Sequence, residues 1–356
     1  MRVCWSAVLL AVCCWAAAGD GASVDSVVAT VRTSLRKKHK DADLAASLEN
    51  VNLTERLEDR VVEILESEGA GPQTLGALQR LRDRSRLLPL PSDPPPGMTP
   101  PPPPSSAEER QVWLATSGKA EDYTRSLPDF ICTETVHRWI APDGNEAWRA
   151  SPTVVAELTF FERKEHYKLL TVDGRPAEKS LLAVGGTISQ GEFGSMLATI
   201  FSPASDTDHR WDHWTTLRKR PTSVYFFRIS IAHAPHHLVF AAGDGKTVGT
   251  ATGEHGFLYV DRATNSVTRI VQEVEDIPAG FPVRKSSTVL DYDYADIGGR
   301  KFLLPLRAEL RLDSAKTQNL NAVAFQAYHK FVAGTSIQYW DTGQDPNDPK
   351  PAPIKK

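Results

Sequence analysis

The chain has 356 residues, of which 41% are hydrophobic and 24% are charged, which is ordinary for a globular protein and long enough for two domains. Its formal net charge of -3 excludes a global attraction to nucleic acid or to an anionic membrane. The 25 prolines are less ordinary, because many of them are clustered.

The N-terminus has the residue order of a secretory signal peptide. Arg2 precedes an apolar run, and Ala16-Ala17-Ala18 supplies the small residues of a cleavage site. We therefore expect residues 1–22 to be a signal peptide that is cleaved near Ala18 or Ala22. The mature chain is then exported to the periplasm or secreted, with envelope association left open. No later run approaches the roughly 18 apolar residues that a membrane-spanning helix needs, so no transmembrane segment is expected in the mature chain.

Of the four cysteines, three fall in the signal peptide and only Cys132 remains after processing. No intramolecular disulfide is therefore expected. A lipoprotein signal ending at Cys13 is a competing hypothesis, but Val12 stands where such sites have Gly, Ala or Ser. Because Cys132 alternates with polar residues in a predicted strand, we interpret it as a small buried hydrophobe rather than a reactive thiol.

Residues 23–88 are predicted to form a helical module. Thr54 is expected to cap its middle helix, and the run 69–72, Gly-Ala-Gly-Pro, ends that helix and starts the next. This turn resembles the helix-hairpin-helix motif, in which backbone amides grip a phosphate. However, residues 25–88 carry 11 acidic and 11 basic residues, without the basic excess of a DNA-binding face. We expect the module to pack or to dock a protein partner, and we expect no nucleic acid.

Residues 89–106 are predicted to be a linker between two modules. Ten prolines lie between Pro89 and Pro104, including five in succession, which excludes helix and central strand. A semi-rigid polyproline spacer is the expected structure, and a role as a proline-rich ligand is the alternative.

Residues 107–342 carry recurrent strand patterns and little helix, and 343–356 are expected to be a disordered tail. After a short helix at 107–127, apolar and polar side chains alternate in roughly ten segments. This series predicts an α+β chain whose C-terminal domain is a curved antiparallel sheet or half-barrel, covered by a short helix. The expected strands are 130–139, 154–161, 167–172, 224–231, 237–242, 257–260, 267–274, a hairpin over 286–312, 322–331 and 336–340.

The hairpin over 286–312 is expected to be the longest part of the sheet, with one apolar and one polar face. Gly298-Gly299 supplies its turn. On the first strand, Asp291 and Asp293 are expected on the polar face. The expected apolar face comprises Leu290, Tyr292, Tyr294, Leu304, Leu306, Ala308, Leu310 and Leu312.

A helix is predicted over 192–201, because residues 189–192 have the capping-box pattern and apolar residues follow at helical spacing until Pro203. We expect it to lie on the apolar face of the sheet, either as a plug in the core or as a movable lid over a cavity. The candidate residues for an apolar ligand are Phe193, Met196, Leu197, Ile200 and Phe201 from the helix and Leu304, Leu306 and Leu310 from the sheet.

The run from Gly256 to Asp261, the strand over 267–274 and the run from Leu290 to Pro305 resemble the closing strands of LolA/LolB-type periplasmic lipoprotein carriers. In those carriers a run of the type (D/Y)Y, variable, (I/V)xG, (L/F)P is common. The resemblance covers about residues 121–341, and it implies a half-open barrel around an apolar cavity and a lipid or lipoprotein acyl chain as ligand. The chain departs from the pattern by an insertion around 202–221 and by the helical module. The whole chain also resembles exported bacterial proteins of uncharacterised function.

No motif predicts a catalytic residue. His209 and His213 have the i, i+4 spacing that would hold a divalent metal on a helix, but neighbouring tryptophans favour a surface loop. Ser189 is one residue away from a serine-nucleophile turn, yet Thr187 stands where that turn needs glycine, and helix capping explains Ser189 better. No cofactor is expected.

Three functional hypotheses remain open. The first is an exported binding protein, not an enzyme, that holds a lipid or acyl chain in the half-barrel. The second is a non-enzymatic scaffold or regulatory protein with a fully packed sheet, which joins partners through the helical module. The third is a metal-dependent hydrolase through His209 and His213 or a serine hydrolase through Ser189.

Overall fold

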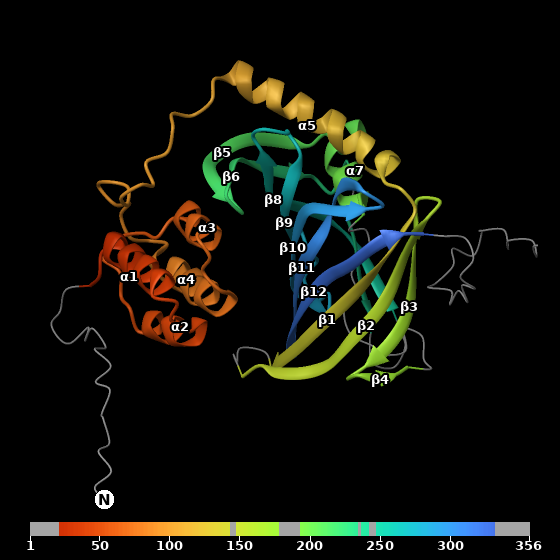
Figure 1. The fold of residues 1–356 in the computed structure, drawn as a ribbon, viewed down its shortest axis with the longest axis horizontal. Helices are drawn as coiled ribbons and strands as arrows, with labels where there is room; N and C mark the ends of the chain where they lie inside the picture. Colours follow the sequence, from red (N-terminus) through yellow and green to blue (C-terminus); the bar gives the residue numbers. More distant parts are fainter. Residues whose placement is uncertain (1–20, 143–146, 178–192, 234–235, 242–246, 332–356) are drawn as a thin grey trace, which may run out of the picture. The chain divides into compact units, whose positions relative to one another are not determined.

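The computed structural model describes residues 21–142, 147–177, 193–233, 236–241 and 247–331. Contacts divide the chain into two compact units. We call Met1–Pro101 with Thr216–Lys219 the helical unit, and Pro102–Thr215 with Arg220–Lys356 the sheet unit. The expected α+β class, with N-terminal helices and a curved, unclosed antiparallel sheet, is confirmed (Figure 1).

The helical unit has an aliphatic core. Valine, leucine and alanine side chains form it, together with Met98. Two of its helix starts are set by local chemistry: the Ser23 hydroxyl accepts the Ser26 amide hydrogen at 3.2 Å, and Pro72 occupies the first turn of its helix, where no amide hydrogen is needed. The helices are α1 (Val24–Arg36), α2 (Asp41–Glu49), α3 (Asp59–Ser67) and α4 (Pro72–Ser85).

The start of α3 differs from the prediction. Glu58, not Thr54, precedes its first turn, and the Thr54 amide donates to the Ala22 carbonyl at 3.0 Å. Ala22 in turn forms an isolated bridge with Leu53 and donates its amide to Asn52. The segment before α3 is therefore extended because it pairs with the chain before α1, an interaction between residues about thirty positions apart that helical spacing does not encode.

The first half of the expected linker packs on the helical unit. Met98 is 2% exposed and belongs to the aliphatic core, and its carbonyl accepts a hydrogen bond from the Arg60 guanidinium at 2.5 Å. The Arg56 amide also donates to the Pro89 carbonyl at 2.7 Å. Pro89 and Met98 of the expected spacer thus contact the helical unit, and Met98 is apolar enough to join its core.

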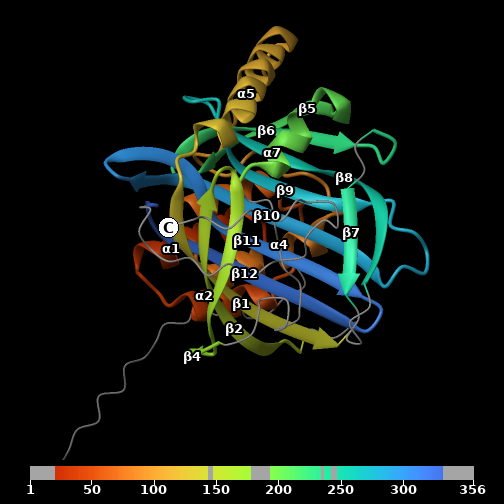
Figure 2. The same ribbon diagram turned by 90° about the vertical axis from the view of Figure 1, so that its right-hand side faces the viewer.

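The sheet unit begins with α5 (Ser106–Ser126), whose capping box joins Ser105 and Glu108. The sheet follows in the order β4-β3-β2-β1-β12-β11-β10-β9-β8-β6-β5, and β7 pairs with β8 off this path (Figure 2). Every described pairing is antiparallel, and the two ends of the path, β4 and β5, do not pair with each other within the described residues. The strands are β1 (Phe130–Pro142), β2 (Arg149–Phe161), β3 (Lys164–Val172), β4 (Arg175–Pro176), β5 (Asp208–Leu217), β6 (Arg220–Ile229), β7 (His236–Ala241), β8 (Thr247–Asp261), β9 (Val267–Glu275), β10 (Val283–Ile297), β11 (Arg300–Ser314) and β12 (Thr317–Lys330).

The predicted hairpin is β10 and β11, but its faces do not alternate along the whole length. The register shifts where Asp291 pairs with Arg307 and Tyr292 with Pro305, which leaves Leu306 as the extra residue of a β-bulge. Leu306 is 38% exposed as a result, instead of lying on the apolar face. Tyr294 is also exposed rather than buried.

The polar face expected around Asp291 also needs correction. Asp291 is buried, and its carboxylate accepts from Arg269 Nε and from Arg307 Nε, both at 2.7 Å. Two guanidinium groups compensate for its desolvation, which alternation of apolar and polar residues does not predict.

Candidate functional site

The sheet is curved (Figures 1 and 2), and we call the face that carries α7 the concave face. One cluster of buried side chains lines this face. It contains many aromatic rings and extends from Tyr167 on β3 to Tyr225 on β6. Residues of α5 complete it, together with those of a second helix, α7 (Ser195–Phe201). The strand residues of this cluster include Phe130, Cys132, Leu158, Phe160, Phe227, Leu258, Ile270, Leu290, Tyr292, Leu304, Ala308, Val323 and Phe325.

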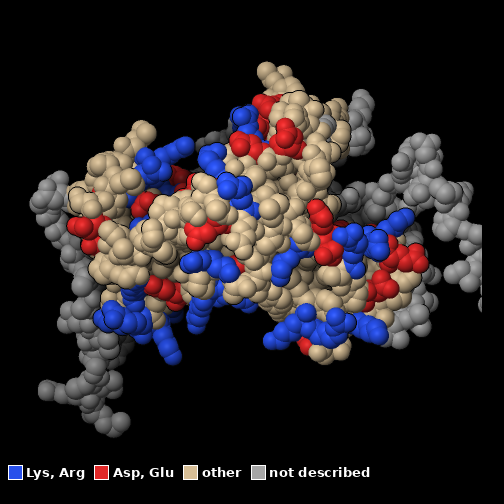
Figure 3. Space-filling view, turned by 90° about the horizontal axis from the view of Figure 1, so that it is seen from above, with Lys and Arg blue, Asp and Glu red and all other residues tan. Residues whose placement is uncertain are grey.

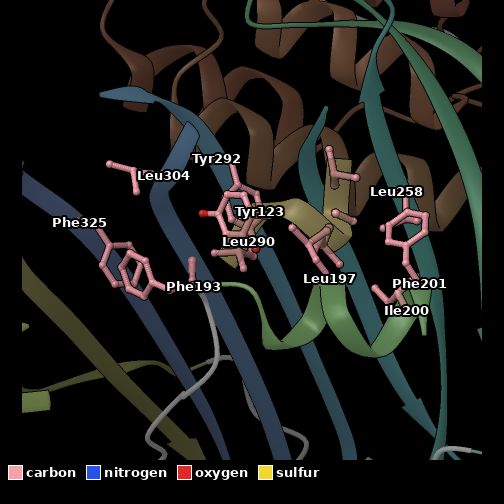
Figure 4. Close-up of a cluster of buried hydrophobic side chains, with 14 of the residues drawn as sticks. Tyr123, Phe193, Leu197, Ile200, Phe201, Leu258, Leu290, Tyr292, Leu304 and Phe325 are labelled. Carbon is pink, nitrogen blue, oxygen red and sulfur yellow. The ribbon is translucent and has the colours of Figure 1, made fainter. Parts of the chain in front are cut away.

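The helix α7 begins later than predicted but faces the sheet as predicted. Its first residue is Ser195 rather than Glu192, after Gly194, whose φ of 124° is accessible mainly to glycine. The capping-box residues 189–192, including Ser189, lie outside the described residues. Figure 4 shows Leu197, Ile200 and Phe201 on the side of α7 that faces the strands. All three are buried, and Met196 is half-buried against the same cluster.

Phe193 lies just before α7 and fills an aromatic pocket of the sheet. Its ring centroid lies 5.3 Å from that of Phe130, 6.1 Å from that of Phe160 and 5.6 Å from that of Phe325. The side chain is 2% exposed. The Phe193 amide donates to Glu165 Oε1 at 3.4 Å, which holds the backbone as well as the ring.

The three candidate residues from the sheet occupy three different environments. Leu304 is fully buried in the cluster, and Leu310 packs against it while half-buried. Leu306 lies on the bulge and is exposed, so it does not share the buried face with the other two leucines. The bulge, an inserted residue that reverses the alternation, explains why a strict two-residue period placed Leu306 incorrectly.

The helix α5 supplies two residues to this site that sequence reasoning missed. The Trp113 ring stacks on the His209 ring at 3.7 Å between centroids and lies 4.9 Å from the Phe201 ring of α7. Ten residues later, Tyr123 lies edge-on to Tyr292 with centroids 5.8 Å apart, and Figure 4 shows the two rings side by side. The only available signal for them was aromatic residues in a helix whose apolar spacing is otherwise irregular.

Several polar groups lie among these apolar side chains. Tyr328 donates its hydroxyl hydrogen to the Pro305 carbonyl at 2.6 Å, and Cys132 lies next to that hydroxyl and is hydrogen-bonded to it. Burial, the main cause, raises the pKa of the Cys132 thiol far above its usual range, and nearby Glu134 adds to the effect. The thiol is therefore protonated and inert as a nucleophile, as the buried-hydrophobe interpretation expects.

Glu165 on β3 brings a carboxylate to the edge of the cluster. Its Oε2 accepts the Tyr167 hydroxyl at 2.8 Å, and its Oε1 accepts the Phe193 amide. Burial raises the pKa of the Tyr123 hydroxyl well above its usual range, and Glu165 contributes to the shift. Tyr123 therefore remains a neutral hydrogen-bond donor at all physiological pH values.

His209 and His213 are not on a helix and not on a loop, because both lie on β5. Four residues of strand separate them by about 13 Å, too far to share one metal ion. Their contacts also differ: His209 stacks on Trp113, whereas His213 Nδ1 lies 2.7 Å from Asp212 Oδ2. Among the described residues, no group of three or more His, Cys, Asp or Glu side chains is arranged to hold a metal ion.

The backbone amides that follow the Gly-Ala-Gly-Pro turn, at the start of α4, already form hydrogen bonds within the helical unit. Asp41 accepts the Gln73 amide hydrogen at 2.8 Å and the Thr74 amide hydrogen at 3.0 Å. A carboxylate of this chain thus lies where a helix-hairpin-helix motif would bind phosphate. On the face drawn in Figure 3, basic and acidic side chains are interspersed.

Within the part of the chain that the structure describes, no helix is long and apolar enough to cross a membrane.

No protein-family model matches the chain. No curated protein matches it. Among solved structures, it aligns with a DUF1329 family protein from Desulfovibrio piger at 10% identity over 63% of this chain and 95% of that one, with a TM-score of 0.32. It also aligns with a LolA superfamily protein from Nitrosomonas europaea at 11% identity, over 62% and 93% of the two chains, with a TM-score of 0.27. A putative outer membrane lipoprotein-sorting protein domain from Vibrio parahaemolyticus aligns at 8% identity, over 68% and 96%, with a TM-score of 0.31.

Proposed function

We propose that the sheet unit binds an apolar chain, such as the acyl chain of a lipid or lipoprotein, on its concave face beneath α7. The observation that carries this proposal is the cover of that face: among the described residues Phe193, the short helix α7 and one side of α5, rather than a second sheet, shield its aromatic side chains. The chain then acts as an exported, non-enzymatic binding protein, in accord with the signal-peptide pattern of its N-terminus.

A bound apolar chain can offset the energetic cost of displacing α7. A helix of seven residues is too short to be stable by itself, so packing alone holds it in place. A methylene chain that replaces Leu197, Ile200 and Phe201 on the sheet would restore most of the buried apolar area, at about 25 cal/mol per Å². Gly194, directly before the helix, tolerates backbone angles on both sides of φ = 0 and is suited to be the hinge.

The first test is extraction of the purified full-length protein with organic solvent, followed by mass spectrometry. We expect a lipid or another acyl compound in the extract. Added fatty-acyl compounds should raise the midpoint of denaturant unfolding, because a ligand that binds only the folded state stabilises it. An empty extract together with unchanged unfolding midpoints would contradict the proposal and favour a fully packed sheet.

Trp113 offers a local reporter of α7. Its ring lies 4.9 Å from Phe201, so movement of α7 should change its fluorescence when ligand binds. The fluorescence of the Trp113→Phe variant comes from the other tryptophans only. Subtracting it from the wild-type fluorescence gives the signal of Trp113. Ligand binding without any change in the difference signal would show that α7 stays in place.

A second candidate function, docking of a protein partner, is favoured by a groove in the helical unit. The groove has a volume of about 740 Å³ and runs along α1. Val28, Ala29 and Leu35 give it an apolar floor, while Asp25, Arg36 and the Arg32–Glu68 ion pair supply charges of both signs.

Ala29→Arg tests this candidate, because Ala29 is exposed and a longer charged side chain would obstruct the groove without entering the core. Cross-linking in cells should lose its protein adducts in this variant if the groove docks a partner, while lipid binding by the sheet unit is retained. Identical adducts in the wild type and the variant would contradict docking at this groove.

A further inference from the structure

Five polar residues lie together on the otherwise apolar concave face: Tyr123, Cys132, Glu134, Glu165 and Tyr328. We call them the polar cluster. Phe130, Cys132 and Glu134 alternate on β1, so the thiol and the carboxyl group face the core with the phenylalanine. Burial of both Cys132 and Glu134 confirms this arrangement.

A second irregularity of the sheet brings Tyr328 to the same place. The pairing of β1 with β12 shifts between Ile131 and Thr133, and Ala327 has a φ of 56°, which is rare for a residue other than glycine. The extra residue lets Phe325 and Tyr328, three positions apart, both pack on the cluster. Bulges of this kind are common beside functional sites, where they change the direction of a side chain.

Most of the hydrogen-bonding capacity of the polar cluster is used within the chain. The Tyr328 hydroxyl donates its hydrogen to the Pro305 carbonyl, and Cys132 lies beside it. Each oxygen of Glu165 already accepts a hydrogen bond, from Tyr167 and from the Phe193 amide. None of these hydrogen bonds involves the Tyr123 hydroxyl.

The Tyr123 hydroxyl forms no such bond with a described residue. Its oxygen is buried, the residue is 7% exposed, and no described residue forms a hydrogen bond with it. A buried polar group without a partner destabilises a protein, and replacement by an apolar group of the same shape would remove that penalty. A buried hydroxyl that no described residue satisfies is a candidate for a hydrogen bond to a ligand.

We propose that the Tyr123 hydroxyl donates a hydrogen bond to the carbonyl oxygen of an esterified or amide-linked acyl chain whose methylene groups lie under α7. This inference rests on the proposed function and names the chemical end of the ligand. The Tyr123 ring lies against Tyr292, in the same cluster as Leu197 and Phe193, so the polar end and the apolar cover belong to one site (Figure 4).

The charge of the polar cluster selects among acyl compounds. Glu165 is close enough to Tyr123 to affect its titration, and both Glu134 and Glu165 affect that of Cys132. A free fatty-acid carboxylate at the Tyr123 hydroxyl would repel these two carboxylates in a poorly solvated place. A neutral ester or amide carbonyl accepts the same hydrogen bond without that repulsion.

The test compares Tyr123→Phe with the wild type in the full chain, with three probes that share one hydrocarbon length: methyl palmitate, palmitate and hexadecane. We expect the wild type to bind the ester about tenfold more tightly than the variant does, the contribution of one hydrogen bond. Hexadecane should bind both proteins equally. At about pH 7, palmitate should bind the wild type at least about tenfold more weakly than the ester does. The ester carbonyl stretch should move to lower frequency on the wild type only.

Tyr225→Phe is the matched control, because Tyr225 is a buried tyrosine of the same cluster that lies near Trp113, about 15 Å along α5 from Tyr123. It should bind the ester as the wild type does. Equal ester affinity of the wild type and Tyr123→Phe, with the same carbonyl frequency, would overturn the inference while the proposed function stands. Failure of all three probes to bind the wild type would overturn both.

Discussion

The two units of this protein bury their side chains in different ways. The core of the helical unit consists of valine, leucine and alanine with one methionine. The core of the sheet unit contains six phenylalanines, four tyrosines and a cysteine among its buried residues. Its covering segment, Phe193 with α7, is short. The helical unit thus has an aliphatic core, whereas the sheet unit has an aromatic face that α5 and the short α7 cover, and the proposed function assigns the apolar ligand to that face.

The buried polar groups of the two units differ in the same way. In the helical unit, the Thr74 amide and hydroxyl bond to Asp41, and the Ser85 hydroxyl accepts the Leu57 amide hydrogen while donating to the Arg82 carbonyl. Each of these groups therefore stabilises the fold. In the sheet unit, the Tyr123 hydroxyl has no such partner among the described residues. Under the proposed function, the first unit has a structural core and the second a core that also binds a ligand.

The largest expected effect is that of Phe193→Ala. Removal of a buried phenylalanine typically costs about 3 to 5 kcal/mol in the free energy of unfolding, because transfer and cavity terms add. The cavity would be lined by Phe130, Phe160 and Phe325, so an added acyl ester should stabilise the variant more than it stabilises the wild type. Denaturant unfolding with and without the ester measures both quantities. A loss that the ester leaves unchanged would indicate that the aromatic pocket is closed to ligands.

Two leucines, one in each unit, give a matched comparison. Leu197 on α7 is 3% exposed and Leu78 on α4 is 0% exposed, so truncation of either to alanine should cost about 2 to 5 kcal/mol. Ligand should recover part of the Leu197→Ala loss and none of the Leu78→Ala loss. Hydrogen exchange of each unit, followed separately, locates the loss. Equal recovery in both variants would mean that the ligand acts on the chain as a whole, and the comparison of the two cores would fail.

Much of this fold was predictable from residue periodicity. Alternation located most strands of the sheet, and the apolar stripe before Pro203 located the helix that covers it. The burial of Phe193, Leu197, Ile200 and Phe201 follows from the same stripe. Their role in ligand binding stays a prediction, because burial alone does not separate a lid from a plug.

The features that periodicity missed depend on contacts between distant residues. The bulge at Leu306 is a matter of register between two strands, and one inserted residue reverses which side chains face the core. The strand β5 was expected to be a surface loop because tryptophans neighbour its two histidines. It lies at the end of the sheet, where the Trp211 amide donates to Glu109 of α5 at 2.7 Å instead of to a neighbouring strand.

The polar cluster was equally hidden from sequence reasoning. Tyr123 lies on α5 and Tyr328 on β12, more than two hundred residues apart in the chain. No spacing rule connects them, and a bulge is needed to turn Tyr328 toward the core. The sequence does show a lone cysteine in a strand, but only the structure shows that tyrosine and glutamate side chains surround it.

A smaller effect is expected from Asp41→Ala in the helical unit. Asp41 accepts the Gln73 and Thr74 amide hydrogens, so it acts as the cap of α4 from a neighbouring helix. Loss of a helix cap typically costs about 0.5 to 2 kcal/mol. The variant should unfold at lower denaturant concentration, with the ester-induced stabilisation of the sheet unit unchanged.

Asp41 also predicts a pH dependence. Partial burial acts to raise the pKa of its carboxyl group, but the hydrogen bonds from Thr74 and Gln73 outweigh burial and lower the pKa. A lowered folded-state pKa gives a contribution that is present above the unfolded value of about 3.9 and is lost as pH falls through the folded value. The difference in stability between the wild type and Asp41→Ala should therefore shrink in acid. A difference that grows in acid would contradict the assignment of Asp41 as an ionised cap.

The smallest expected effect is that of Arg32→Gln at the groove of the helical unit. Arg32 forms a two-pronged ion pair with Glu68, at 2.8 and 2.7 Å, and donates to the Pro96 carbonyl at 2.7 Å. The pair is partly exposed, so its loss should cost about 0.2 to 1 kcal/mol. Arg36→Gln is the control, because Arg36 forms no ion pair in the described part of the chain.

Salt screens exposed charges. The loss of unfolding free energy in Arg32→Gln should therefore be smaller at high than at low sodium chloride concentration, whereas the loss in Phe193→Ala should be the same at both. Loss of the same size at both salt concentrations would show that Arg32 acts through Pro96 and packing rather than through charge. In that case the surface ion pair would not contribute to the stability of the helical unit through its charge. The contrast between the polar groups of the two units would then depend on the Tyr123 hydroxyl.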